Sequence, residues 1–146
     1  MENLTELISY AAGYFDGEGS IYLTRCGPEL YLRVSIISGD LVSLNLMAKL
    51  FGGNPRVSQI TTTNRIMYRW LVTSDKALLC LRRMRPFLLA KGPQAELVLS
   101  SGYVTQIWNY PNKAEQRQLR VELKKSLEAM RRPPAKTENI APKTHH

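Results

Sequence analysis

The run from Ala11 to Ser20 constrains the fold of this chain more than any other segment. It reads Ala-Ala-Gly-Tyr-Phe-Asp-Gly-Glu-Gly-Ser, and apolar residues at helical spacing precede and enter it. A helix is therefore predicted to end among two acids interleaved with glycines, and to pass directly into a strand at Ser20. Gly13 and Gly17 lie four residues apart and share one face of this helix, so a second backbone can approach closely there.

Glu18 lies where that close contact would end. A symmetric partner would bring a second Glu18 close to the first. Two carboxylates at short range repel each other unless cations lie between or beside them. Because oxygen ligands in phosphate-directed chemistry favour magnesium, the segment indicates a Mg²⁺ site at the contact between two copies.

Two hairpin-and-helix units follow the leading helix. The predicted strands are 20–26, 30–37, 56–61 and 65–73, and the helices that follow each pair are 40–51 and 74–86. The sequence thus predicts an α+β fold of order αββαββα. In this fold a four-stranded antiparallel sheet carries helices on one face and leaves the other face open.

We expect residues 1–108 to form this core domain. Residues 109–132 are predicted to be a C-terminal basic helix, and residues 133–146, which are polar and rich in proline, a disordered tail. Cys26 and Cys80 are isolated, so neither a zinc knuckle nor a disulfide framework is indicated. The two histidines, His145 and His146, end the chain and are assigned no catalytic role.

The charge balance points to a polyanionic partner. Twenty Lys and Arg residues face 12 Asp and Glu residues, which gives a net charge of +8. A basic protein of the membrane surface is the rival class, but no segment is long and apolar enough to span or anchor. The first residues lack the order of a signal peptide, so we expect an intracellular protein.

Strand alternation predicts which side chains share the open face of the sheet. The residues expected to contact DNA are Ser20, Tyr22, Thr24, Tyr31, Arg33, Ser35, Arg56, Ser58, Arg65, Met67 and Arg69. Beyond Ser58, the pair Gln59-Ile60 leaves the alternation of the third strand open. An ordinary solvated face is the alternative, but four arginines without an acid favour nucleic acid.

Residues 11–19 resemble the motif of the LAGLIDADG homing endonucleases, and the likeness runs from about Leu4 to Leu99. The departures are Ala for Leu, aromatic residues for Leu and Ile, Gly for the third Ala, and Glu for the second Asp, a place where the family admits either acid. The resemblance implies the αββαββα fold. It also implies a sequence-specific nuclease that hydrolyses double-stranded DNA with a divalent metal at a long pseudo-palindromic site, typically encoded by an intron or intein.

The resemblance also implies roles for single residues. Glu18 and the Gly17 carbonyl would bind Mg²⁺, for which Mn²⁺ can substitute, while Ca²⁺ would support binding without efficient cleavage. Lys91 falls where the family has a basic residue near the active site. The family's water-ordering position, often Gln, falls on Ser38 or Gly39. The expected homodimer interface comprises Ala12, Gly13, Asp16 and Gly17, and Asp16 is also expected to bond backbone at the helix junction.

A binding function on the same scaffold is the second interpretation. The chain would then be a catalytically silent DNA-binding protein or a maturase that binds intron RNA. Loss of the second acid would mark such a protein, and Glu18 is intact. A basic regulator unrelated to the family would leave the acid-glycine repeat without a role.

Overall fold

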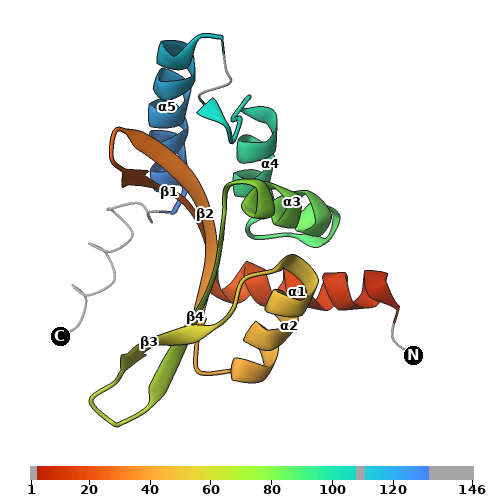
Figure 1. The fold of residues 1–146 in the computed structure, drawn as a ribbon. Coiled ribbons are helices and arrows are strands. Elements are labelled where there is room, and N and C mark those ends of the chain that lie inside the picture. The colour runs from red at the N-terminus through yellow and green to blue at the C-terminus, as the bar shows by residue number, and fades with distance from the viewer. Residues whose placement is uncertain (1–2, 108–110, 132–146) are drawn as a thin grey trace, which may run out of the picture.

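The structure of this protein is a computed structural model that describes residues 3–107 and 111–131 (Figure 1). The elements in chain order are α1 (Leu4–Glu18), β1 (Gly19–Cys26), β2 (Glu29–Ser38), α2 (Leu41–Phe51), β3 (Arg56–Ile60), β4 (Ile66–Thr73), α3 (Ser74–Met84), the 3-10 turn η1 (Arg85–Phe87), α4 (Gly92–Ser100) and α5 (Lys113–Arg131). The predicted αββαββα order is confirmed. The predicted tail at residues 133–146 lies outside the described residues.

The four strands form one antiparallel sheet in the order β1-β2-β4-β3. Helices α1 to α4 lie on one side of it, and the β3–β4 hairpin projects beyond them (Figure 1). Alternate strand residues pack against these helices in a single core. Fully buried members of this core include Phe15, Ile21, Leu32, Ile36, Leu44, Met47, Trp70, Leu81 and Met84.

Helix α5 covers the part of the β2 edge that does not pair with β4. The pairing of β2 with β4 ends at Arg33 and Thr73, so the first residues of β2 have a free edge. Arg120 of α5 donates to the Leu30 carbonyl at 2.8 Å, and the Leu32 amide donates to the Tyr103 hydroxyl at 3.0 Å. Buried strand edges need such partners.

Helix α5 buries both apolar and polar side chains against the rest of the subunit. Leu123 and Leu127 are buried, but Met130 is 43% exposed. Arg120, which is fully buried, and its neighbour Gln116 take the remaining inward positions, and the Arg120 guanidinium lies 4.5 Å from the centre of the Tyr103 ring. A basic side chain lies inside because it satisfies backbone groups that an apolar one could not.

The junction of α1 and β1 has no connecting loop. Helix α1 ends at Glu18, and Gly19 is already the first residue of β1. A Cβ atom on Gly19 would lie 2.2 Å from the Phe15 ring, so the ring occupies the space that a side chain would need. This contact fixes the direction in which the helix passes into the sheet.

Gly19→Ala is therefore expected to destabilise the fold. A methyl group there overpacks the core against Phe15, and overpacking costs about 1–3 kcal/mol. Thermal unfolding should show a melting temperature lower by several degrees. Gly92→Ala is the matched control, because a Cβ on Gly92 meets nothing within 4 Å. Equal melting temperatures for the two variants would contradict the steric account of this junction.

Candidate active site and nucleic-acid interface

Helix α1 has one side inside the subunit and one side outside. Ala11, Ala12 and Phe15 are fully buried, while Gly13 and Gly17 are exposed. The placement of Ala12 at a dimer interface was therefore wrong: its side chain points into the subunit core with that of Ala11 and cannot contact a partner. A Cβ on Gly13 or Gly17 would meet nothing within 4 Å, so the packing of the subunit does not require glycine at either position.

Asp16 joins the end of α1 to a loop far away in the sequence. Its carboxylate accepts hydrogen bonds from the backbone amides of Leu89, at 2.6 Å, and Lys91, at 2.9 Å. The Lys91 ammonium group in turn donates to the Asp16 carbonyl at 2.9 Å. Asp16 thus bonds backbone at the helix junction, as expected, and its carboxylate is committed within the subunit.

This arrangement brings Lys91 to the last turn of α1, where Gly17 and Glu18 lie. Carbonyl groups in the last turn of a helix have no intrahelical donor. Lys91 satisfies one of them, the Asp16 carbonyl, so a purely structural helix-capping role is also compatible with its position. Three residues predicted as site residues, Gly17, Glu18 and Lys91, are therefore neighbours although the first and last are far apart in sequence.

The Glu18 carboxylate is exposed and forms no hydrogen bond or ion pair with other described residues. Together with the Gly17 carbonyl it offers two oxygen ligands of the kind that Mg²⁺ accepts, and Mg²⁺ commonly keeps several waters and binds substrate phosphates besides. Among residues 3–107 and 111–131, no group of three or more His, Cys, Asp or Glu side chains could hold a metal. A metal at this position would therefore be held by few protein ligands.

Ser38 ends β2 and is held by two neighbours. Its Oγ accepts a hydrogen bond from the Tyr14 hydroxyl at 2.7 Å and another from the Asp40 amide at 3.0 Å. Burial and the negative charges of Asp40 and Glu18 raise the pKa of Tyr14, so its hydroxyl stays protonated well above neutral pH. Gly39, the alternative water-ordering position, lies against the Arg65 guanidinium, which would be 3.2 Å from its Cβ.

The open face of the sheet carries the alternation that the sequence predicted for β1 and β2. Tyr22 pairs with Arg33, Ser20 with Ser35 and Thr24 with Tyr31, which places all six on one face. Ser35 differs from expectation in one respect. It is buried, and its hydroxyl lies 3.5 Å from the Tyr22 hydroxyl, so its neighbours cover it and it presents little surface to a ligand.

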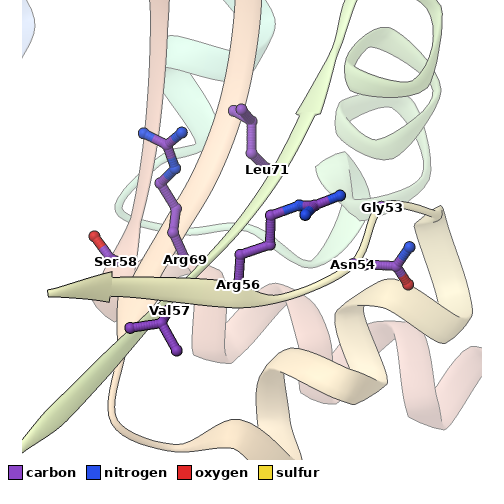
Figure 2. Close-up of a pocket in the computed structure, with 7 residues that line it drawn as sticks. All are labelled: Gly53, Asn54, Arg56, Val57, Ser58, Arg69 and Leu71. Carbon is purple, nitrogen blue, oxygen red and sulfur yellow. The ribbon is translucent and has the colours of Figure 1, made fainter.

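Arg56 and Arg69 pair across β3 and β4 and line a hollow of about 560 Å³ on the same face. Figure 2 shows both side chains on one side of β3 and Val57 on the other. Arg65 precedes β4. Glu29, the acid at the start of β2, is buried and bonded to Arg117 at 2.6 Å, which lowers the pKa of Glu29. This acid therefore adds no free negative charge to the face.

A β-bulge changes the face to which Gln59 belongs. The register shifts between Val57 and Gln59, so Ser58 is the extra residue and Gln59 pairs with Met67. Gln59 thus joins the arginine face, as do Ile37, Leu71 and Thr73 through their pairing with Arg69, Ser35 and Arg33. The broken alternation at Gln59-Ile60 was the available signal for the bulge.

Solved structures resemble this arrangement. The homing endonuclease I-CvuI, in complex with its target in the presence of Ca, superposes with a TM-score of 0.65 at 18% identity, over 90% of this chain and 85% of I-CvuI. The archaeal intron-encoded homing endonuclease I-Vdi141I, complexed with DNA, gives 0.67 at 15% identity, over 87% of this chain and 85% of that one. The chain has the LAGLIDADG homing endonuclease fold.

The likeness predicted from residues 11–19 is confirmed at the level of the fold. The LAGLIDADG homing endonuclease I-GzeII, also in complex with a DNA target, matches 93% of this chain but 49% of its own, with a TM-score of 0.61 at 16% identity. No protein-family model and no curated protein matches the sequence. No helix among the described residues has the length and apolar character needed to cross a membrane.

Asp16→Ala is expected to release the loop that carries Lys91. The change removes the acceptor for two backbone amides, and hydrogen bonds to charged groups contribute about 1.5–3 kcal/mol each. Amide hydrogen exchange at Leu89 and Lys91 should accelerate. Lys91→Met is the matched control, because it removes the ammonium group but keeps both amides bonded to Asp16. If amide exchange at Leu89 and Lys91 is unchanged in Asp16→Ala, the Asp16 carboxylate does not hold this loop in place.

Proposed function

We propose that this protein is a homodimeric, Mg²⁺-dependent, site-specific endodeoxyribonuclease of the homing type. The observation that carries the proposal is the set of hydrogen bonds made by Asp16, which hold Lys91 against the last turn of α1, the turn that ends at the exposed Glu18. This cluster adjoins a sheet whose open face carries Arg33, Arg56 and Arg69. I-CvuI, I-Vdi141I and I-GzeII, which share the fold, are homing endonucleases captured on DNA.

A second copy completes the site. The chain contains one acid-glycine motif, and one subunit supplies one carboxylate at the end of α1. The exposed side of α1 carries Tyr10, Gly13 and Gly17, and the two glycines are open to contact. Pairing two α1 helices through this side would place the two Glu18 carboxylates at the centre of a two-fold symmetric complex. Each sheet would then cover one half of a pseudo-palindromic site.

The chemistry divides among few groups. Glu18 and the Gly17 carbonyl would hold the metal, which when bound supplies an activated water and neutralises phosphate charge. Lys91 would stabilise negative charge that develops at the scissile phosphate. Ser38 would help to order the attacking water. Asp16 acts as a positioning residue, because its contacts hold Lys91 near Glu18.

The open face of the sheet would read the DNA. A two-stranded β-ribbon fits the major groove, where all four base pairs can be distinguished. Arginine pairs with guanine through two hydrogen bonds, and Arg33 and Arg69 lie on neighbouring strands of this face. Gln59, brought to the face by the bulge, is suited to adenine.

Binding and cutting are measured separately, because they can be uncoupled. I-CvuI on the I-CreI target with 2 mM Mg shows DNA that is not cleaved. A protein that binds DNA or intron RNA without cutting is the alternative function on this fold.

Glu18→Gln should abolish double-strand cleavage and preserve specific binding. The amide keeps the shape of the side chain but removes the charge that retains the cation. Sites are first selected from randomised duplexes with Mg²⁺, and cleavage and gel shift are then measured on the same duplex. Ca²⁺ in place of Mg²⁺ should support binding with little cutting, and Mn²⁺ should restore cutting. A mutant that cuts at the wild-type rate would exclude Glu18 as the ligand, and a wild type that binds but never cuts would favour the alternative function.

Arg69→Ala should weaken binding by about 1–3 kcal/mol and relax the preference at one base pair of each half-site, if Arg69 reads a base. A uniform loss on all sequences, with a salt slope smaller by about one, would assign it to a phosphate instead. Arg83→Ala removes the same charge from α3, on the opposite face of the sheet, and should change neither quantity. Equal effects of the two variants would contradict the assignment of the open face to DNA.

A further inference from the structure

A chain of hydrogen bonds connects α1 to the start of α2. It passes from the Tyr14 hydroxyl to Ser38 Oγ, where the amide of Asp40 also donates. The Asp40 carboxylate caps α2 by accepting from the amide of Ser43 at 3.1 Å and from its hydroxyl at 2.6 Å. Tyr14 lies one helical turn before Glu18, so this chain begins beside the proposed active site.

The two hydrogen bonds that Ser38 Oγ accepts leave its hydroxyl able only to donate a further one. A serine oxygen has two acceptor lone pairs and one O–H donor. Tyr14 and the Asp40 amide both donate to this oxygen, so both lone pairs are occupied. Among the described residues, none accepts a hydrogen bond from Ser38 Oγ, so its proton is left for an acceptor outside this chain of bonds.

We propose that Tyr14 is a positioning residue, which orients the Ser38 hydroxyl as an obligatory donor to the water that attacks the DNA phosphate. The proposal rests on the proposed nuclease function and adds to it a residue that the sequence motif left without a role. The contact with Tyr14 thereby fixes the direction of the Ser38 O–H bond, which could otherwise rotate freely. Without Tyr14, one lone pair of Ser38 is free and the hydroxyl can rotate to accept from the water instead.

The contact between Tyr14 and Ser38 is specific enough to isolate. Tyr14→Phe removes one oxygen and keeps the ring that packs against the core. Ser38→Ala removes the group that is oriented. Ser43→Ala is the control, because Ser43 lies in the same chain of bonds but does not contact Ser38, and its backbone amide still caps α2 through Asp40.

The test is single-turnover cleavage of the selected duplex with Mg²⁺, with affinity measured in Ca²⁺ and melting temperature for every variant. Tyr14→Phe and Ser38→Ala should each cut about ten- to a hundredfold more slowly, as expected for lost orientation. Their affinities for DNA should equal that of the wild type. The double variant should be no slower than the slower single variant, because the two residues act as a unit.

Three results would overturn the inference while leaving the nuclease function intact. These are wild-type cleavage by Tyr14→Phe, losses that multiply in the double variant, and an equal loss in Ser43→Ala, which would indicate a general effect on the chain of bonds. A wild type that fails to cut with either Mg²⁺ or Mn²⁺ would overturn the nuclease function, and this inference with it.

Discussion

Asp16 holds together two parts of the chain that the proposed chemistry needs in one place. The residue lies in the last turn of α1, where carbonyl groups lack intrahelical donors, and it faces the loop that carries the Leu89 and Lys91 amides. Its carboxylate satisfies both of these amides, and the Lys91 side chain returns to the Asp16 carbonyl. The same contact region thus supplies acceptors for the loop amides and a donor for a helix carbonyl. The position of Lys91 near the end of α1 follows from these backbone hydrogen bonds.

Helix α1 contacts the subunit core on one side, leaves its other side exposed, and passes into the sheet at its end. The glycines at these places, Gly13, Gly17 and Gly19, allow this arrangement. Phe15 fills the space beside Gly19, so the helix passes into the sheet without a loop. Gly13 and Gly17 lie on the opposite side, where added side chains would meet nothing in the subunit. The end of the helix, which carries Glu18, thereby lies at the junction of the core, the open side of α1 and the sheet.

Local sequence patterns predicted much of this molecule, and long-range contacts explain where they failed. Period-two alternation placed Tyr22 and Arg33 on one face, because one face of the sheet is buried and alternation follows burial. It could not assign Gln59, since a bulge adds one residue to the strand and reverses the pattern. The apolar pattern also missed Arg120, whose burial depends on the free edge of β2 that only the assembled sheet reveals.

The candidate site shows the same division. Glu18 and Lys91 were predicted from the motif and from the alignment around it, and their roles in cleavage are proposals. Ala12 was misassigned because neighbouring positions on a helix differ by about 100°, so the side chain beside Gly13 already points inward. The bond from Tyr14 to Ser38 joins residues 24 apart, and nothing in the local sequence of either residue specifies it.

We propose that two copies of α1 meet through their exposed sides and bring the two Glu18 positions together. The most direct measurement is the distance between nitroxide labels on Glu18→Cys, determined by electron paramagnetic resonance on the complex with the selected duplex. Cys26 is exposed and is replaced by serine, so that it does not take up the label. Cys80 can stay, because it is buried and burial raises the pKa of its thiol, which disfavours the reactive thiolate. If the two helices pair in this way, the two labels should couple strongly, at a distance well below about 30 Å, the diameter of a small domain. Distances of about that diameter or more, or no coupling at all, would contradict this pairing.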